Sequence, residues 1–522
     1  MRYDTIIVGA GSAGAILAAR LTEDPDRDVL LLEAGPDYPD VESLPDLVKW
    51  GYGLDSTAKD RLASPDWAHY VARAAGAGQP MIVPRGRVTG GSSAVNAQMF
   101  LRGLPEDYDD WAEQGNDRWS YRELLPYFRR IETDRDFRGD FHGTDGPIIV
   151  SRQPREAWPP DQMAWVDACG ALGFPESPDL NDPDSTGVSP TPFNTVDRVR
   201  WSTAIGYLNP ARGRSNLTIK SNFRANRVVF DGRRAVGVEG RLGVEVLTVY
   251  GEEVILAAGA IGSPHLLLLS GVGPAPDLDG VGIPPVHDLP GVGRNLRDHP
   301  QVQMLFRCRR PFAVDKGHRF NAQILRYTAS GSNLRNDIYI HPTGPGQSRG
   351  RNSAYAVDGS SEASGFGLVA ALYLAEGAGQ LGLLSPDPGI QPDLDYNYLE
   401  SDFDRSRMRE AVRLCIEIAQ QRGLSEIVES CIDPTAADLK SGDTLDEWLL
   451  RNARTSQHIS GTCKMGPASD LTAVVDQFGK VHGLEGVRVA DASIMPDCIR
   501  ANTNATCMAI GERIADFVKN GE

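Results

Sequence analysis

The chain has 522 residues, with 53 lysine and arginine residues against 70 aspartate and glutamate residues, which gives a formal net charge of −17 at pH 7. This length exceeds what one hydrophobic core usually serves, so at least two domains are expected. The acidic balance argues against nucleic acid or an anionic membrane surface as a partner. The seven cysteines form no C-x-x-C pair, so neither a disulfide framework nor a metal site is expected.

The first residues predict a βαβ unit. Residues 5–8 (TIIV) are typical of a parallel strand buried on both faces, and GAGSAG, a helical segment and a second apolar run, VLLLEAG, follow. In this fingerprint Gly9 allows the tight turn, Gly11 lets backbone approach a pyrophosphate, and Gly14 lets the helix pack on the strand. Glu33 ends the second strand, where its carboxylate can accept hydrogen bonds from ribose hydroxyls. The pattern predicts a dinucleotide site that suits either NAD or FAD.

A second segment of small residues, GRVTGGSSAVN, occupies positions 86–96. Its glycines allow close backbone approach, and Asn96 can both donate and accept hydrogen bonds. On its own this segment is equally typical of an ordinary turn.

The remaining elements are predicted from periodicity and turn residues. Residues 154–162 and 174–194 are rich in proline and aspartate and indicate connectors. Residues 218–256 predict strands and hairpins, and residues 342–366 predict a surface loop rich in glycine and serine. Residues 404–421 predict an amphipathic helix that packs into the core.

Five motifs, taken together, resemble the glucose–methanol–choline (GMC) family of flavoproteins. In chain order they are VGAGSAG…LLLEAG, GRVTGGSSAVN, AAGAIGSPHLLLLSGVGP, GVGRNLRDHP and HISGTCKMG…VRVADASIMPDCIRANTNA. Within the family, the chain is similar to bacterial FAD-dependent alcohol oxidases and dehydrogenases such as hydroxymethylfurfural oxidase. Thr89 stands where the family usually has an aliphatic residue. Val95 stands where some members link FAD covalently through a histidine, so noncovalent FAD is expected.

The resemblance implies an α/β fold (α+β overall). A Rossmann-like FAD-binding domain would be interleaved with a substrate-binding domain that is built on an antiparallel sheet with helices. The FAD-binding domain is expected to comprise residues 1–155, 200–300 and 450–522, and the substrate-binding domain residues 156–199 and 301–449.

The resemblance also implies the catalytic residues. His458 opens HISGTCKMG, where the family carries its catalytic histidine, and Asn502 matches a second position that is His or Asn across the family. Imidazole, with an ordinary pKa of about 6.5, can take the alcohol proton as hydride leaves for the flavin, which is worth about 10²- to 10⁴-fold in rate. The amide of Asn502 can hold the substrate oxygen. His142 and His299 lie in stretches that resemble family structural motifs, and a turn or cofactor-neighbour role is expected for them.

The cofactor contacts are carried over from the family in the same way. Val228 is the expected adenine contact, and Asp491 and Ala492 match the place where the ribityl and pyrophosphate part is bound. The full set of expected FAD contacts is Gly9, Gly11, Ser12, Ala13, Gly14, Glu33, Ala34, Arg87, Gly91, Ser92, Asn96, Ala97, Val228, Asp491, Ala492 and Asn502.

The implied reaction is oxidation of a primary alcohol to an aldehyde, with electrons passed to oxygen or to another acceptor. Two other reactions of the family keep the flavin without oxidising an alcohol, in hydroxynitrile lyases and in a light-driven fatty-acid decarboxylase. A flavin-binding structural protein is a third alternative, in which His458 and Asn502 would have no task. Choline is a less favoured substrate because the sequence shows no obvious aromatic cage.

The N-terminal residues lack the pattern of a signal peptide, and together with the cysteine usage this predicts a cytoplasmic location. The longest stretch without Asp, Glu, Lys or Arg, residues 254–276, contains glycines and a proline near its centre and predicts a strand, a turn and a short helix rather than a membrane span. The expected partners are a small-molecule alcohol and an electron acceptor, with the oligomeric state left open.

Overall fold

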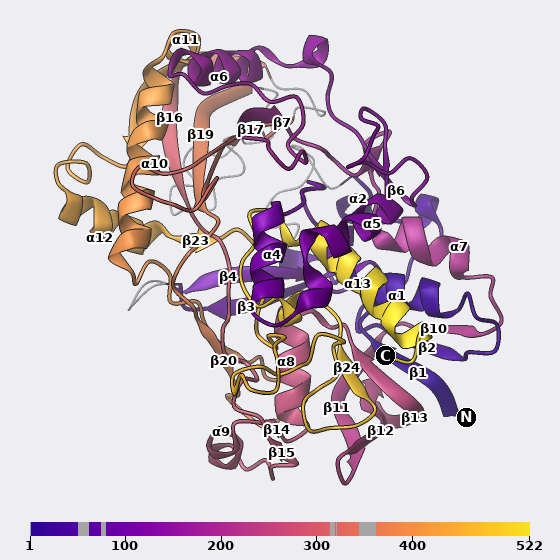
Figure 1. Ribbon diagram of the computed structural model, residues 1–522. Helices are drawn as coiled ribbons and strands as arrows, with labels where there is room; N and C mark the ends of the chain where they lie inside the picture. Colours follow the sequence, from indigo (N-terminus) through magenta and orange to yellow (C-terminus); the bar gives the residue numbers. More distant parts are fainter. Residues whose placement is uncertain (1, 51–61, 75–79, 314–318, 320, 344–361) are drawn as a thin grey trace.

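The computed structural model describes residues 2–50, 62–74, 80–313, 319, 321–343 and 362–522. Two seven-stranded sheets form the framework of this described part (Figure 1). The first sheet has the order β10-β2-β1-β13-β12-β11, with β24 beside β13. Its strands are β1 (Arg2–Val8), β2 (Val29–Leu32), β10 (Leu217–Lys220), β11 (Phe223–Asp231), β12 (Arg234–Leu242), β13 (Glu245–Leu256) and β24 (Val487–Val489).

The centre of the first sheet is the predicted βαβ unit. β1 lies between β2 and β13 and is parallel to both. Ile6 and Ile7 are fully buried, as expected for a strand that is covered on both faces. The helix α1 (Gly14–Leu21) follows β1 and packs against α13 (Thr503–Lys519), the last helix of the chain (Figure 1). Strands β11, β12 and β13 form the predicted hairpins.

The second sheet is antiparallel and has the order β22-β16-β19-β18-β17-β7, with β23 beside β16. Its strands are β7 (Gly187–Pro190), β16 (Pro300–Ala313), β17 (Gln323–Tyr327), β18 (Ile338–Thr343), β19 (Glu362–Leu372), β22 (Val428–Asp433) and β23 (Arg454–Thr455). Most of the helix α10 (Asp402–Gln420) was predicted, and it lies along this sheet (Figure 1). Its Met408, Val412 and Cys415 are fully buried, so its apolar face contributes to the core.

The other elements are shorter or connect the two sheets. The remaining α-helices are α2 (Asp46–Lys49), α4 (Pro105–Glu113), α5 (Tyr121–Ile131), α6 (Pro160–Ala171), α7 (Asn209–Ala211), α8 (Gly259–Leu269), α9 (Ala275–Gly280), α11 (Leu424–Ile427) and α12 (Gly442–Asn452). The shorter strands are β3 (Trp67–Ala72), β4 (Met81–Gly86), β5 (Glu132–Asp134), β6 (Ile148–Val150), β8 (Thr195–Val196), β9 (Val199–Arg200), β14 (Val272–Gly273), β15 (His287–Asp288), β20 (Gln380–Gly382) and β21 (Asp393–Asp395).

The structure corrects three boundaries of the sequence interpretation. The connector expected at 154–162 ends early because α6 begins at Pro160, and proline is well suited to the first turn of a helix. The second connector, 174–194, contains β7. The expected loop at 342–366 begins in β18 and ends in β19, while its part 344–361 lies outside the described residues.

The uncharged stretch 254–276 forms the end of β13 followed by α8, as predicted. Among the described residues, no helix combines the length and the apolar character that crossing a membrane requires.

Candidate active site

A cavity of about 690 Å³ lies at the carboxyl edge of the parallel strands of the first sheet. Val8 and Leu32 end β1 and β2, Ala257 follows β13, and all three line the cavity. Ligands of open α/β sheets bind at this edge. The cavity is also lined by the β3–β4 hairpin and by residues from 86–97, 456–459 and 502–507. Its volume is within the range of about 300–1,000 Å³ that ligand pockets usually have.

Two glycine-rich turns meet in this cavity with their backbones in contact. A Cβ atom at Gly91 would stand 2.6 Å from the Cα of Gly11, and Gly91 has a φ of +52°. A Cβ at Gly9, whose φ is +103°, would stand 2.5 Å from the carbonyl oxygen of Ala257. Gly14 does not line the cavity, but a Cβ there would stand 1.9 Å from the carbonyl oxygen of Gly9. These positions require glycine because any side chain would fill the space at the two turns or push the turns apart.

Glu33 lies beside these turns and is buried. Its Oε2 accepts a hydrogen bond from the N–H of Ala10 at 3.0 Å, and its Oε1 accepts one from the N–H of Gly35 at 2.8 Å. Burial raises the pKa of Glu33 to about 7, although the backbone N–H groups act in the opposite direction. A carboxylate held in this way can still accept hydrogen bonds from ligand hydroxyls with its remaining lone pairs.

Several buried polar atoms of cavity-lining residues have no hydrogen-bond partner in the described part of the chain, and three of them bear on the site. They are Asn504 Nδ2, Asn502 Oδ1 and His265 Nε2. The other amide atom of Asn504, Oδ1, accepts a hydrogen bond from the hydroxyl of Ser12 at 2.8 Å. Because buried polar groups are normally satisfied, these atoms indicate that a polar ligand belongs in the cavity. The two glycine-rich turns, Glu33 and these polar atoms without a partner together fit a dinucleotide.

The structure brings nearly all of the expected cofactor residues to this cavity. Ser92 Oγ accepts from the N–H of Gly86, and Asn96 Oδ1 accepts from the N–H of Gln98. The side chain of Arg87 donates to the carbonyl of Pro65. The lining residues that were predicted are Gly9, Gly11, Ser12, Ala13, Glu33, Ala34, Arg87, Gly91, Ser92, Asn96, Ala97, Asp491, Ala492 and Asn502.

Asp491 organises the turn from which it comes rather than presenting a free carboxylate. Its Oδ2 accepts hydrogen bonds from the N–H of Gly259 at 2.9 Å and the hydroxyl of Ser263 at 2.5 Å. Its Oδ1 accepts from the N–H of Ser493 at 2.8 Å. Burial raises the pKa of Asp491, and these donors oppose the rise.

Val228 is not brought to the cavity. It is buried in the middle of β11, where its N–H donates to the hydroxyl of Ser270 at the end of α8. The same strand reaches the cavity three to five residues earlier, through Phe223, Arg224 and Ala225. The motif lies in a strand that reaches the cavity, but which residues of that strand line the cavity depends on its pairing and twist. The adenine assignment to Val228 therefore lacks support in the geometry.

His458 and Asn502 meet in the cavity. The side-chain Nδ2 of Asn502 lies 2.8 Å from Nε2 of His458, and both residues line the cavity. Asn502 precedes α13 as its N-cap but makes no capping hydrogen bond with its side chain, so its amide is available to the cavity. Because the Nδ2 of an amide is only a donor, Nε2 of His458 carries its lone pair on this side. A nitrogen with this lone pair can accept a proton.

Asp298 holds the backbone of His458. The sequence analysis did not single out this residue. Its Oδ1 accepts hydrogen bonds from the backbone N–H groups of His299 at 2.8 Å and His458 at 2.9 Å. Its Oδ2 accepts from the hydroxyl of Tyr398 at 2.6 Å and from that of Thr455. Burial raises the pKa of Asp298, while these four donors stabilise the ionised form. The backbone of His458 is thereby fixed.

His299 also belongs to this group. Its Nδ1 lies 2.8 Å from Nδ1 of His458, and its ring stacks on Tyr373 with centroids 4.1 Å apart. The motif RNLRDHP was recognised, but the sequence contains no signal that pairs residue 299 with residue 458. The pairing arises from the second sheet, because β16 begins at Pro300 and pairs with Thr455 of β23.

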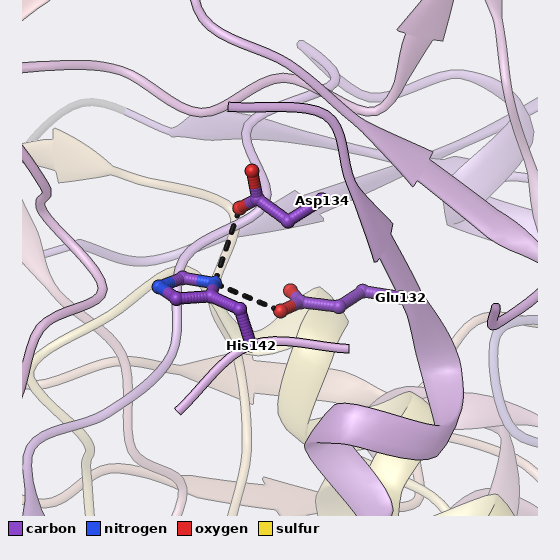
Figure 2. Close-up of side chains that lie close together, drawn as sticks. All are labelled: Glu132, Asp134 and His142. Carbon is purple, nitrogen blue, oxygen red and sulfur yellow. Dashed lines mark hydrogen bonds and ion pairs between the residues drawn. The ribbon is translucent and has the colours of Figure 1, made fainter. Parts of the chain in front are cut away.

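A second buried group of ionisable side chains surrounds His142, and none of its members lines the cavity. Figure 2 shows the imidazole of His142 facing the carboxylates of Glu132 and Asp134. Nδ1 lies 3.0 Å from Glu132 and 3.1 Å from Asp134, and Nε2 lies 2.8 Å from Asp179. Burial alone would lower the pKa of His142, but hydrogen bonds to the three carboxylates outweigh it and raise the pKa to about 10. His142 is therefore a cation that donates from both ring nitrogens.

The same carboxylates have further cationic partners. Arg152 lies 2.9 Å from Asp134 and 2.6 Å from Asp179, and Arg102 pairs with Glu132. Glu132, Asp134 and His142 are close enough to suggest metal ligands, but a protonated imidazole offers no lone pair to a metal. The arrangement is that of a charge-balanced ion-pair network.

Comparison with known proteins agrees with this geometry. The chain matches the N- and C-terminal family models of GMC oxidoreductase over residues 3–301 and 375–511. It is 38% identical over 541 residues to an oxygen-dependent choline dehydrogenase of Klebsiella pneumoniae (strain 342), which covers 99% of this chain and 96% of that protein. It is 37% identical over 537 residues to oxygen-dependent choline dehydrogenase 1 of Chromohalobacter salexigens, with 99% and 95% covered.

Solved structures show the same architecture. The chain superimposes on pyridoxine 4-oxidase from Mesorbium loti with a TM-score of 0.90 and 30% identity over 99% of each chain. A fungal aryl-alcohol oxidase shares the fold, with a TM-score of 0.85 at 23% identity over 100% of this chain and 99% of that one.

The fold and the cavity define a dinucleotide-dependent oxidoreductase. The chain belongs to the GMC oxidoreductase family. It is an FAD-dependent enzyme that acts on the CH–OH group of alcohols, with an FAD-binding and a substrate-binding domain. The predicted family, fold class, cofactor and enzyme class are thereby confirmed.

Proposed function

We propose that this enzyme oxidises a neutral primary alcohol to an aldehyde, with His458 as the base and Asn502 as the group that holds the substrate oxygen. One observation carries the proposal: a single cavity is lined by His458 and Asn502 and also by the glycine turns and Glu33 that fit a dinucleotide. When bound there, FAD supplies the acceptor for the hydride.

His458 and Asn502 have different roles toward the alcohol oxygen. An oxygen that enters beside them can donate its proton to Nε2 of His458 and accept the N–H of Asn502, two groups that now lie 2.8 Å apart. Removing the hydroxyl proton pushes electron density into the carbon–hydrogen bond and so helps hydride to leave. Asn502 keeps the carbinol carbon oriented during this step.

The lining of the cavity favours a neutral substrate. Among its described residues the acidic side chains are Glu33 and Asp491, and both are already engaged by backbone N–H groups. Besides His458, the Asn502 amide contacts Met99, whose sulfur lies 4.0 Å from Nδ2. A quaternary ammonium group is normally held by aromatic faces or by a carboxylate. The two carboxylates of the cavity are already engaged, and its aromatic lining residues Trp67, Tyr70 and Phe223 come from β3 and β11, whereas Met99 is the apolar side chain beside Asn502. The substrate of the choline dehydrogenase relatives is therefore not proposed for this chain.

The domain limits and the cofactor linkage belong to the same proposal. We assign residues 1–155, 200–300 and 450–522 to the FAD-binding domain, and residues 156–199 and 301–449 to the substrate-binding domain. The order of the strands in the two sheets supports this division, except that β23 at 454–455 pairs within the second sheet. We propose noncovalent FAD because Val95, which lines the cavity, has no nucleophile. The seven cysteines are free, which supports a reducing, cytoplasmic location.

The test is to mix the holoenzyme anaerobically with a panel of primary alcohols and with choline, and to follow the flavin absorbance. Bleaching by neutral alcohols, with little or none by choline, is expected. Bleaching by choline alone would contradict the neutral-substrate proposal, and no bleaching by any alcohol would favour the lyase or photochemical alternative. Readmission of oxygen, with measurement of peroxide, then distinguishes an oxidase from a dehydrogenase that uses another acceptor.

A further inference from the structure

We propose that His299 is a positioning residue for the base: its Nδ1 accepts the N–H of His458 Nδ1 and holds His458 in the tautomer whose Nε2 lone pair faces the cavity. The inference deepens the proposed function and rests on the role of His458 as the base.

Only one hydrogen atom can lie between the Nδ1 atoms of the two rings. The Nδ1 atoms of His299 and His458 are 2.8 Å apart, so one nitrogen donates and the other accepts. If His458 donates, its Nε2 is free of hydrogen and can act as a base. If His299 donates, His458 must carry its proton on Nε2 and cannot accept the proton of an alcohol. The direction of this hydrogen bond therefore decides whether the base is competent.

The surroundings of the other nitrogen of His299 support the direction in which His458 donates. The ring of His299 forms a hydrogen bond with the backbone of Ile499, and this bond acts to raise the pKa of the ring. A bond that stabilises the protonated ring is one in which the ring donates, so the acceptor is the carbonyl of Ile499. Since Nδ1 of His299 faces His458, the donor is Nε2. A neutral ring that carries its proton on Nε2 has a lone pair on Nδ1, which accepts from His458.

The imidazole of His299 remains neutral near pH 7. Burial, and to a lesser degree the charge of Arg297, lowers the pKa of His299 to about 3, against the smaller effect of the Ile499 carbonyl. The ionisable groups facing it are Asp298, Tyr373 and His458. A neutral His299 does not compete for the proton that His458 takes from the alcohol, so that proton stays beside the cavity.

Asn502 points to the same tautomer from the opposite side. Its amide donor lies 2.8 Å from Nε2 of His458, which requires a lone pair on that atom. The ring is therefore held at both nitrogens, while Asp298 fixes the backbone of both histidines. Tyr373 stacks on His299 with an interplanar angle of 19° and limits rotation of that ring.

The test compares two substitutions of similar size. The amide of His299→Asn can place its oxygen close to the position of Nδ1 and accept from His458, whereas His299→Leu removes the acceptor. In anaerobic stopped-flow experiments, His299→Leu should slow reduction of the flavin by an alcohol on the order of 10²-fold, and His299→Asn should recover most of this loss. Both should retain FAD. His287→Leu, on β15 and outside the cavity lining, is the control for loss of a histidine.

A second measurement does not depend on activity. Holoenzyme labelled with ¹⁵N-histidine, with the His458 signals assigned by comparison with His458→Gln, should show His458 protonated on Nδ1 and His299 on Nε2. In His299→Leu the His458 signals should shift towards the Nε2-protonated form.

The outcomes separate the two proposals. An Nε2-protonated His458 in the wild-type enzyme would overturn the role of His299, even if His299→Leu fails to fold. Reduction of His299→Leu at the wild-type rate would do the same while leaving His458 as the base. Rapid reduction of His458→Ala would instead overturn the proposed function itself.

Discussion

Gly11 and Gly91 face each other across the two glycine turns, so that a Cβ atom at residue 91 would stand 2.6 Å from the Cα of residue 11. The neighbour is backbone and cannot rotate away, and residue 91 has a φ of +52°, which disfavours a side chain. The contact joins residues that are far apart in the sequence, and both residues line the cofactor cavity.

Gly91→Ala should therefore abolish or strongly reduce FAD binding. The methyl group must push the turns apart or enter the space that the cofactor needs. The ratio of flavin to protein absorbance in the purified variant measures this effect. Gly170→Ala is the matched control, because a Cβ there meets nothing within 4 Å and the residue lies in α6. Full flavin content in Gly91→Ala would show that the turns do not hold the cofactor.

Glu33→Gln should weaken FAD binding by about 10- to 100-fold, with little change in folding. The amide keeps one oxygen acceptor but turns an NH₂ group towards one of the two backbone N–H groups that the carboxylate now satisfies. It also loses a charged acceptor for ribose hydroxyls, and hydrogen bonds to charged groups are worth about 1.5–3 kcal/mol. Titration of the apoprotein with FAD, followed by flavin fluorescence, gives the dissociation constant. An unchanged constant would remove Glu33 from the site, and the exposed Glu485→Gln serves as the comparison.

His458→Ala should lower the rate of flavin reduction by about 10²- to 10⁴-fold, which is the usual contribution of a general base. Asn502→Ala should lower it by about 10-fold, because it removes one hydrogen bond of about 1–1.5 kcal/mol. Both variants should keep FAD, which absorbance at purification checks. His482→Ala is a suitable control, since His482 hydrogen-bonds the carbonyl of Gly466 and does not line the cavity. Similar rates in the two variants and the wild type would contradict the assigned roles.

Substitution of His142 should destabilise the enzyme in a pH-dependent way. The pKa of His142 is about 10 in the fold and about 6.5 when unfolded. Protonated His142 therefore contributes its full stabilisation below pH ~6.5 and loses it as the pH rises to about 10. The difference in thermal midpoint between the wild type and His142→Gln should be largest near pH 6 and shrink towards pH 10. A difference independent of pH would show that His142 is not a cation in the fold.

The ion-pair network around His142 can also be tested for metal binding. Because the imidazolium has no lone pair for a metal, treatment with EDTA should leave the thermal midpoint of the wild type unchanged. A fall in the midpoint that added divalent metal restores would identify Glu132, Asp134 and His142 as metal ligands after all.

The sequence was sufficient for features that are encoded locally. The strand, glycine turn, helix and acidic residue of the βαβ unit follow one another within residues 2–33, and each has its own physical signature. The apolar spacing of 404–421 was enough to predict most of α10. His458 and Asn502 were assigned from family motifs, and the structure places them in contact.

What the sequence left out depends on long-range pairing. Asp298 and His299 reach His458 because β16 pairs with β23, and Asn504 reaches Ser12 because α13 packs against α1. Neither contact follows from spacing in the chain. Val228 does not line the cavity for a related reason, since the part of β11 that lines it depends on the register with β12 and not on the motif.

The pairing of Pro300 with Thr455 has a consequence for how the enzyme loses activity. This strand pair and the hydrogen bond from the N–H of Ser456 to the carbonyl of His299 anchor His299 and His458 to the second sheet. Asn502 begins α13, which packs against α1 beside the first sheet. His458 and Asn502, although both lie in the segment 450–522 assigned to the FAD-binding domain, are thus anchored to different sheets, whereas Glu33 follows β2 of the first sheet. On gradual heating we therefore expect a small shift of one sheet against the other to lower the rate of alcohol oxidation before FAD is released.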